Sequence, residues 1–360
     1  MSIQGFEQSP DSLVSVVIVN WNRRVLLESC LRSMGREQGV AFEIIVVDNG
    51  STDGSRDLVR TFMGGPHPVH LIENPDNRGF CEANNQGIAA ARGEFIALLN
   101  NDAEAEPRWL AHLLAAFVNP DVGMAASKIL VWRAPGAEGP PIIDKVGHLI
   151  YPDGQNRGRG SGELDNGQYD TSEETLWPDG CACMYRKSML DEIGGFDEDL
   201  FAYGDDADLG LRARIAGWRS LYMPQAVVWH HGGSSLGKQN PKRITLIERN
   251  RVLLAVKLFP GSLLCLNGAY YLARIFAGAV AALRNRGEIG QFSSPWLKIQ
   301  AAWALCLGDL QAMAMVPRTL RKRRLILAKR KLSSSETRRL LMRFRIPLRQ
   351  LTDQSASLPR

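Results

Sequence analysis

"GEFIALLNNDAE", residues 93–104, contains the feature that decides the fold. The apolar run from Phe95 to Leu99 has the composition of a buried strand. It leads directly into two amides and a carboxylate, Asn100, Asn101 and Asp102. Side-chain oxygen atoms gathered at the end of a buried strand indicate that a metal ion or a small molecule binds there.

The residues before this stretch alternate between strands and helices. Apolar runs at 14–20, 43–49, 69–74 and 94–100 are separated by segments with apolar residues at helical spacing. Continuously apolar strands joined by helices predict an α/β fold, a mainly parallel sheet covered by helices on both faces. Such sheets bind ligands beyond the carboxyl ends of their strands. The polar residues that we expect at this edge are Asn20, Asn22, Asp48, Asn49, Asn74, Asn100, Asn101 and Asp102.

The predicted edge has none of the common nucleotide-binding motifs. There is no GxxxxGK[ST], and no GxGxxG follows the first strand, which argues against a Walker-type NTPase and a dinucleotide oxidoreductase. The second strand instead ends in "DNGSTDGS", residues 48–55. Asp48 is placed to accept a hydrogen bond from a base or ribose, whereas Ser51 or Asp53 alone would suffice to cap the next helix. Four strand ends at one edge favour a nucleotide site.

Two further groups carry chemistry-bearing side chains. Asp102 suits Mg²⁺ or Mn²⁺, which need one or two carboxylates besides phosphate oxygens, although it also precedes a helix that it would cap. Asp205, Asp206 and Asp208 stand at a predicted helix start, where they favour the helix dipole or supply a general base. His230 and His231 end an apolar strand, as metal or phosphate ligands or as structural residues.

The chain resembles the family 2 inverting glycosyltransferases of the Rossmann-like GT-A fold, and among them the rhamnosyltransferase-like branch. The motifs lie in the family's order across residues 14–235: "VSVVIVNWN", "IIVVDNGSTDGS", "ENPDNRGFCEANNQGI", "GEFIALLNNDA", "GGFDEDLFAYGDDADLGLR" and "HHGGSS". The resemblance implies an enzyme that uses a nucleotide-activated sugar and a divalent metal. It implies cell-surface polysaccharide or glycolipid assembly as the setting.

The resemblance also implies a role for each matching residue. Asp102 takes the place of the last acid of the family's metal motif, and His230, with His231 as the alternate, completes the metal site. Asp206 matches the catalytic base, and Asp205 stands where glutamate is more usual. Arg78 approaches the diphosphate. The remaining residues assigned to the donor are Asn20, Asn22, Asp48, Asn49, Ser51, Asp53, Asn100 and Asn101.

The charge divides the chain at about residue 238. Residues 1–238 hold 20 basic and 33 acidic residues, and residues 239–360 hold 23 and 5, so the net charges are −13 and +18. We therefore expect a catalytic domain at 1–238 and a basic, amphipathic helical region at 239–360. An apolar stretch after Lys257 is interrupted by Asn267 and Arg274, which favours buried or interfacial helices over spanning ones.

The basic region is expected to attach to an anionic membrane surface, with oligomerisation as the alternative role and no nucleic acid expected as a partner. Clustered lysines and arginines bind anionic leaflets. The first residues lack the layout of a signal peptide, which favours the cytoplasm, at the inner face of the membrane. The residues expected at that surface are Arg321, Lys322, Arg323, Arg324, Lys329, Arg330 and Lys331.

The expected function is transfer of a sugar, rhamnose from its dTDP form being favoured, to a hydroxyl of a saccharide or lipid-linked acceptor. One alternative is a UDP-hexose-dependent transferase, for example of galactose or glucose. Another is a catalytically silent GT-A-like binding or scaffold module, because "NND" at 100–102 contains a single acid.

Overall fold

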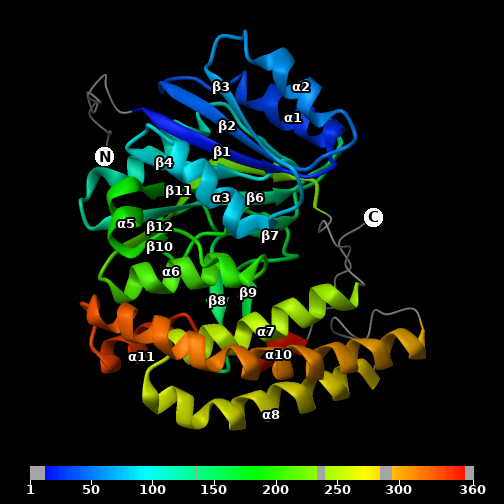
Figure 1. Ribbon diagram of the computed structural model, residues 1–360, viewed down its shortest axis with the longest axis vertical. Helices are drawn as coiled ribbons and strands as arrows, with labels where there is room; N and C mark the ends of the chain where they lie inside the picture. Colours follow the sequence, from blue (N-terminus) through cyan, green and yellow to red (C-terminus); the bar gives the residue numbers. More distant parts are fainter. Residues whose placement is uncertain (1–12, 135, 233–239, 284–293, 353–360) are drawn as a thin grey trace.

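The first hundred residues form the parallel part of one large sheet (Figure 1). The computed structural model describes residues 13–134, 136–232, 240–283 and 294–352. Four parallel strands in the spatial order β3-β2-β1-β4 open the chain. They are β1 (Val14–Asn20), β2 (Phe42–Asn49), β3 (Val69–Asn74) and β4 (Phe95–Leu99). The predicted parallel sheet is therefore confirmed.

The sheet continues beyond β4 with mixed directions. β11 (Ala182–Arg186) runs antiparallel between β4 and β6 (Val122–Val131), and β12 (Arg219–His230) runs parallel to β6. Short strands pair antiparallel with the outer part. These are β5 (Ala103–Ala105), β7 (Ile143–Lys145) and β10 (Glu173–Glu174), while β8 (His148–Ile150) and β9 (Asn156–Gly158) form a separate hairpin.

Helices cover both faces of the sheet, because neighbouring residues of a strand point to opposite faces. Val16 and Ile18 of β1 pack into one core and Val17 into the other. The first core holds α1 (Arg24–Met34), α2 (Ser55–Phe62) and α4 (Trp109–Leu114) with the short helix η1 (Ala115–Val118). The second holds α3 (Gly79–Ala90), α5 (Lys187–Ile193), η2 (Glu198–Leu200) and α6 (Asp205–Ile215).

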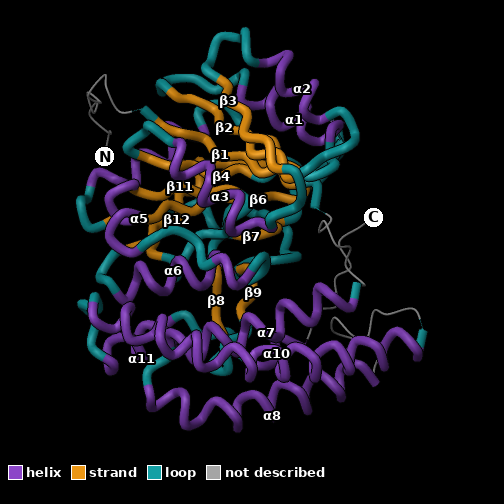
Figure 2. Tube along the Cα trace, viewed as in Figure 1, coloured by secondary structure: helices purple, strands orange, loops and turns teal. Residues whose placement is uncertain are grey.

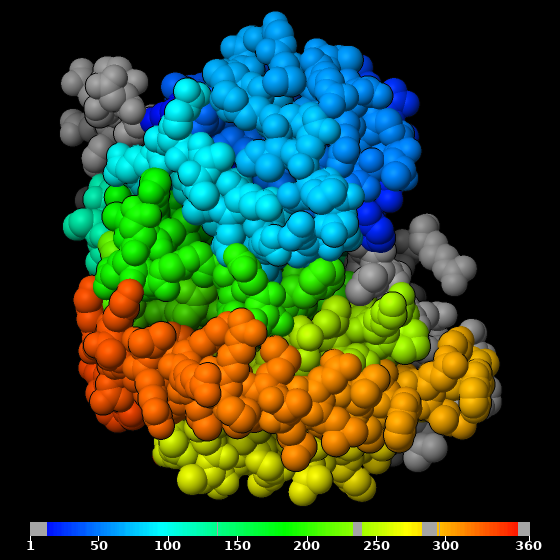
Figure 3. Space-filling view, viewed as in Figure 1, coloured from blue at the N-terminus to red at the C-terminus, as the bar shows by residue number. Residues whose placement is uncertain are grey.

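The C-terminal third is helical, as predicted, and lies at the end of the molecule opposite β2 and β3 (Figures 1 and 2). It comprises α7 (Pro241–Leu258), α8 (Gly261–Leu283), α10 (Pro295–Ala328), α11 (Ser334–Arg343) and α12 (Leu348–Thr352). In the space-filling view α10 crosses the whole width of this face between the N-terminal two-thirds of the chain and α8 (Figure 3). The predicted boundary at residue 238 lies outside the described residues.

Buried charges join these helices to the rest of the chain. Arg274 of α8 donates to Asp153 over 2.5 Å and to Glu248 of α7 over 3.0 Å. Arg251 of α7 also pairs with Glu248, at 2.6 Å. Tyr271 of α8 donates to Asp309 of α10 over 2.7 Å. One face of α8 is therefore fixed to protein, which leaves its other face to solvent or lipid.

Candidate active site

Strand ends meet at the carboxyl edge of the parallel sheet. In the strand register Asn20 lies beside Asp48, and Asn49 beside Asn74. The Asn20 amide donates a hydrogen bond of 3.1 Å to Asp48, and the Asn101 amide donates one of 2.7 Å to Asn20. The end of β4 is thereby joined to the end of β1. The structure brings together the polar residues that the sequence predicted at this edge.

Asp48 is held by an arginine that sequence reasoning missed. Arg56 Nε donates to Asp48 Oδ1 over 2.7 Å, and Arg56 Nη2 donates to the carbonyl of Asn74 over 2.5 Å. Burial raises the pKa of Asp48, but hydrogen bonds from Ser51 and Arg56 lower it by more, so the carboxyl is ionised. An arginine in the first turn of a helix resembles any surface arginine in the sequence, so nothing marked Arg56.

The loops after β1 and β2 are fixed to each other. Asn22 has a φ of 51°, a left-handed conformation in which asparagine is enriched. Ser51 Oγ accepts a hydrogen bond from the Asn22 N–H over 2.9 Å. Asp53 accepts from the backbone N–H groups of Arg24 and Ser55, at 2.8 and 3.1 Å. These contacts hold Asp53 in the turn before α2, whose N-cap residue is Gly54 and has no side-chain cap hydrogen bond.

The next loop carries Asn49 and Arg78. Asn49 Nδ2 donates to the carbonyl of Gly79 over 3.0 Å, and Asn49 Oδ1 accepts from Asn74 over 2.9 Å. Asn49 therefore links the end of β2 to the start of α3. Arg78 is 43% exposed and pairs with Asp76 at 2.6 Å, so it lies on the surface of the same edge.

Asp102 and His230 lie side by side. Asp102 Oδ1 is 3.3 Å from His230 Nε2, and Asp102 Oδ2 is 3.1 Å from Arg23 Nη1. The pair forms because β5, directly after Asp102, pairs with the end of β12 that carries His230. Burial lowers the pKa of His230, but Cys181, Asp102 and Asp144 raise it well above its ordinary value.

This pair has the donors that a divalent cation needs when it also binds phosphate. Mg²⁺ and Mn²⁺ keep waters and take few protein carboxylates. His230 Nδ1 lies 2.7 Å from Asp144 Oδ2, and carboxylates commonly orient metal-binding imidazoles in this way. His231 instead contacts Glu104 at 2.8 Å and stacks on Trp132. The residues present fit the metal, with His230 as the histidine beside Asp102.

A β-bulge holds Asp144 opposite His230. In the ladder between β6 and β7, Ile129 is opposite Lys145, and the next residue of β6 is opposite Ile143. Asp144 is the extra residue between them. Bulges next to active sites commonly re-aim a side chain in this way.

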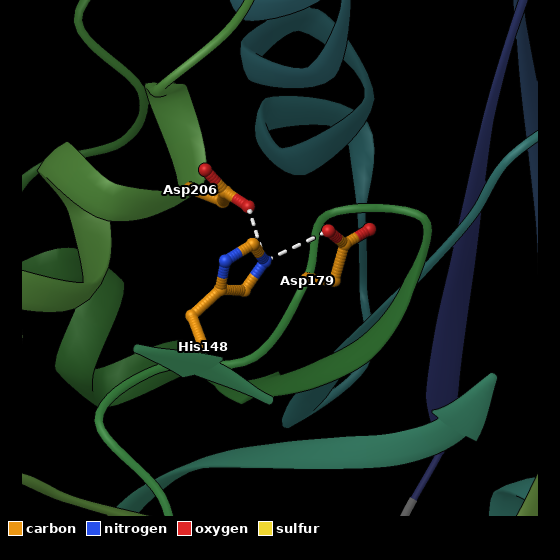
Figure 4. A group of neighbouring side chains, drawn as sticks. All are labelled: His148, Asp179 and Asp206. Carbon is orange, nitrogen blue, oxygen red and sulfur yellow. Dashed lines mark hydrogen bonds and ion pairs between the residues drawn. The ribbon is translucent and has the colours of Figure 1, made fainter. Parts of the chain in front are cut away.

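The acidic cluster at the start of α6 divides into different environments. Asp205 is buried, and burial with the charge of Asp206 raises the pKa of Asp205 well above its ordinary value. The side chain of Asp206 is 13% exposed, and Asp206 Oδ2 lies 3.2 Å from His148 Nε2 (Figure 4). Asp208 is fully buried in an ion pair with Arg212 at 2.9 Å. Asp206 is thus the partly exposed carboxylate of the predicted pair, and Asp208 is structural.

The loop before α6 is strained and is held by α7. Phe201 and Tyr203 have φ values of 64° and 69°, which are rare for aromatic residues. The buried amide of Asn250 donates to the carbonyls of Leu200, Ala202 and Tyr203, at 3.0, 2.9 and 2.7 Å. Nothing in the sequence around Asn250 indicated this role, because its partners lie about 50 residues earlier in the chain.

The segment 135–178, expected to be loop and short strand beside a substrate, supplies His148, which the sequence did not assign to the site. Asp179, just after this segment, contacts both His148 and Lys145 at 2.8 Å. Asn100 joins β4 to β11 through its backbone N–H, which donates to the carbonyl of Cys181 over 2.7 Å. Single histidines and aspartates in a Gly-rich segment carry no motif, so tertiary contacts alone bring His148 and Asp179 to Asp206.

Part of the predicted basic surface is used inside the molecule. Lys322 pairs with Asp197 and Asp199, and Arg323 donates to two backbone carbonyls at the end of α7. Lys322 therefore holds α10 against the segment before α6, and Arg323 holds it against the end of α7. Lys329 and Lys331 contact Glu192 at the end of α5. The remaining predicted residues, Arg321, Arg324 and Arg330, are exposed.

Two C-terminal helices carry exposed apolar side chains. Gly261–Ala282 and Trp296–Ala328 are long and apolar enough to cross a membrane, by length and composition only. The most apolar 18-residue windows of these two helices have mean hydropathies of 1.4 and 1.3. The spacing on α10 is helical, so the exposed residues form one stripe. The stripe residues on α10 are Trp296, Ile299, Trp303, Leu307, Leu310, Met313 and Leu320, and those on α8 are Leu266, Leu272 and Phe276.

Solved structures with a similar fold include two glycosyltransferases. A mannosyltransferase from Pyrobaculum calidifontis in complex with GDP-Man and Mn²⁺ superposes with a TM-score of 0.50 at 17% identity, covering 95% of this chain and 90% of its own. GalNAc-T7 with UDP, GalNAc and Mn²⁺ superposes with a TM-score of 0.55 at 15% identity, covering 75% and 51%. The predicted GT-A fold with a C-terminal helical region is confirmed.

Sequence relatives point to the same group. An N-acetylglucosaminyl-diphospho-decaprenol L-rhamnosyltransferase of Mycobacterium tuberculosis is 31% identical over 253 residues, which cover 63% of this chain and 78% of that protein. An uncharacterized protein of Sinorhizobium fredii is 29% identical over 240 residues, which cover 63% of this chain. The match spans 25% of the length of the Sinorhizobium protein.

Two family models match overlapping parts of the chain. The model of glycosyl transferase family group 2 matches residues 167–308. The model of glycosyl transferase family 2 matches residues 15–194, half of the chain, and these residues include the whole parallel sheet and the Asp102 strand end. The chain belongs to glycosyl transferase family 2.

Proposed function

We propose that the chain is an inverting, metal-dependent glycosyltransferase that moves a sugar from a nucleotide donor to an acceptor hydroxyl. The observation that supports this most strongly is that one short strand, β7, links the metal pair to the general base, while Asn101, next to Asp102, donates to Asn20 of the donor edge. Asp144 of β7 contacts His230, beside Asp102, and Lys145 of β7 contacts Asp179. Asp179 in turn shares His148 with Asp206, so donor edge, metal pair and general base belong to one continuous site.

Rhamnose from dTDP-rhamnose is the favoured sugar. The support is the relative named as an L-rhamnosyltransferase, at 31% identity. The competing donor is a UDP-hexose. The Asn20–Asp48 pair at the end of β1 and β2 would bind the nucleoside of either donor, so these residues do not discriminate between them.

In the proposed mechanism Asp206 removes the proton from the acceptor hydroxyl as that hydroxyl attacks the anomeric carbon from the face opposite the leaving diphosphate. Asp205 is buried behind it, and burial together with the charge of Asp206 raises the pKa of Asp205. Asp102 and His230 would hold Mg²⁺ or Mn²⁺, which supplies charge neutralisation for the leaving group when bound. Arg78, exposed at the same edge, is placed to approach the diphosphate.

Asp206→Asn tests the assignment of the base. The amide keeps the size of the carboxylate and one acceptor oxygen but accepts no proton, so the affinity for the nucleotide sugar should stay the same. General-base catalysis is worth about 10²–10⁴-fold, and kcat should fall by that factor. The measurement is hydrolysis of dTDP-rhamnose, UDP-glucose and UDP-galactose with Mn²⁺, together with donor binding by calorimetry.

Asp205→Asn is the matched control, because it changes the neighbouring carboxylate in the same turn. If Asp205→Asn abolishes turnover and Asp206→Asn does not, the two roles are reversed. If neither variant changes turnover, or if the wild type hydrolyses none of the nucleotide sugars, the catalytically silent binding module becomes the better account.

The acceptor is proposed to be lipid-linked and reached from the cytoplasmic face of the membrane. The name of the relative includes a diphospho-decaprenol, a lipid carrier. The exposed apolar stripes of α8 and α10 would lie in the interface between lipid headgroups and tails, with exposed Arg321 and Arg324 near anionic headgroups. Arg274, paired with Asp153 and Glu248, argues that α8 lies on the membrane and does not span it. Association with a second copy through the same stripes is the alternative.

A further inference from the structure

Asp206 does not stand alone at the start of α6. His148, from the β8–β9 hairpin, lies between Asp206 and Asp179, which precedes β11 (Figure 4). Its Nε2 is 3.2 Å from Asp206 Oδ2 and 2.8 Å from Asp179 Oδ2. Lys145 Nζ lies 2.8 Å from the same oxygen of Asp179. The side chains of His148, Asp206, Asp179 and Lys145, from four different segments, therefore form one connected group.

His148 is rigidly placed. The residue is buried at 5% exposure, and its ring stacks on Trp177 with centroids 5.7 Å apart and planes 20° apart. Nδ1 is buried and has no hydrogen-bond partner among the described residues. Nε2 alone therefore contacts the two carboxylates, by a hydrogen bond to Asp179 and an ion pair with Asp206, and the ring packs against Trp177.

The ligand atoms of His148, Asp179 and Asp206 all lie within 4.8 Å of one another, a spacing that would admit a metal ion. In the structure this group is ion-paired, with Lys145 Nζ 2.8 Å from Asp179 Oδ2 and His148 Nε2 between Asp179 and Asp206, and the inference concerns this ion-paired arrangement. The positive charge that Asp179 and Asp206 need is already supplied by Lys145 and His148. Burial lowers the pKa of His148, but Asp206 and Asp179 raise it to about 9.

We propose that His148 is a positioning residue for the base of the reaction: held by its hydrogen bond to Asp179, which Lys145 also contacts, it fixes the rotamer of Asp206 through the 3.2 Å ion pair between Nε2 and Oδ2. The other oxygen, Oδ1, accepts only a short hydrogen bond from the adjacent backbone N–H of Ala207 among the described contacts, and it is the oxygen that takes the acceptor proton. The inference rests on the proposed function, since it presupposes that Asp206 is the base.

The test compares His148→Ala with His148→Gln, whose amide N–H reaches a position close to Nε2. A misplacement of about 1 Å can cost about 10²-fold in rate, so His148→Ala should lower kcat for nucleotide-sugar hydrolysis by about that factor with KM unchanged. His148→Gln should restore most of the lost kcat. His112→Gln, on α4 and outside the site, is the matched control for changing a histidine.

The pH profile separates positioning from general damage to the fold. Loss of the donor at His148 leaves ionised Asp206 less stabilised, so the acid limb of kcat should move to higher pH in His148→Ala and return in His148→Gln. Besides His148, the titratable groups around Asp206 are Asp205, Asp208, Asp179, Lys145, Cys183 and Tyr185. None of these is altered in either variant.

A second readout needs no substrate. In protein with labelled histidine, the NMR titration midpoint of His148 should fall in Asp179→Asn and in Asp206→Asn, because each variant removes one carboxylate from Nε2. If Asp206→Asn abolishes turnover but His148→Ala retains the wild-type kcat, acid limb and fold, the positioning role is overturned while the proposed function stands. If Asp206→Asn stays active, Asp206 is not the base, and this inference fails with that assignment. The ion pairs of His148 that the titration detects would then be purely structural.

Discussion

Lys257→Met tests whether the C-terminal helices and the catalytic part form one cooperative structure. Lys257 of α7 is 2% exposed and pairs with Asp208 of α6 at 2.5 Å and with Asp197 before η2. Methionine fills a similar volume and leaves both carboxylates with less positive charge nearby. The substitution therefore removes the ionic link between α7 and the helix that carries the predicted base.

The size of the effect follows from the remaining partners. Removing one member of a buried ion pair costs about 3–5 kcal/mol. Asp208 keeps Arg212 at 2.9 Å and Asp197 keeps Lys322, so we expect the lower end, about 3 kcal/mol. With an unfolding entropy of about 2.1 cal/mol/K per residue for the whole chain, this corresponds to a fall in Tm of about 4 °C.

The loss should depend on pH. Burial raises the pKa of Asp197, but Lys257 and Lys322 lower it by more, so the folded pKa lies below the unfolded value. Such a group stabilises the fold above the unfolded pKa of about 3.9 and loses that contribution as the pH falls through the folded pKa. The difference in Tm between Lys257→Met and wild type should be largest near pH 7 and shrink below about pH 4.

Calorimetry of Lys257→Met and of Lys242→Met decides the matter, because Lys242 is an exposed lysine on the same helix. One transition that moves down by several degrees in Lys257→Met only is the expected result. A Tm within 1 °C of wild type would falsify the reasoning on the ion pair. Two separate transitions, with only one of them moved, would mean that residues 239–360 fold as an independent unit.

Three further predictions concern the site and the surface. Asp102→Asn should remove the Mn²⁺-dependent rise in Tm that UDP or dTDP produces in the wild type, and an undiminished rise would exclude Asp102 as a ligand. Asp53→Ala should lower stability by about 1 kcal/mol in urea unfolding, through loss of the turn before α2, with calorimetric donor affinity unchanged; a large loss of affinity instead would return Asp53 to the donor site. Phe276→Glu on α8 should release the protein from vesicles of phosphatidylglycerol in flotation assays more than Lys322→Ser does, and equal binding of all three proteins would refute a membrane contact through the apolar stripes.

The fold was predictable because its signals are local. The strands β1, β2 and β4 are largely apolar runs that lead into polar residues, so the strands and their succession along the chain could be predicted without tertiary information. The Asn20–Asp48–Asn101 network and the Asp102–His230 pair follow from the same logic, since strand ends converge at one edge.

The partners of these residues were not predictable, for an equally physical reason. Arg56, Asp144, His148 and Asn250 carry no spacing or motif, and each gains its role from a contact with a distant segment. The contacts within the basic cluster could not be predicted for the same reason. Charge density in the sequence cannot distinguish Lys322, which is paired with Asp197 and Asp199, from Arg321, which is exposed.

The bulge at Asp144 has a consequence for engineering this enzyme. Deleting that residue would give β6 and β7 an unbroken ladder, which by itself is the more stable sheet. It would also take the carboxylate away from His230 and shift Lys145 relative to Asp179. Loops ahead of β7 are attractive places to vary acceptor preference, and changes of their length are tolerable only while this irregularity keeps its position. A sequence optimised for stability alone would remove it first.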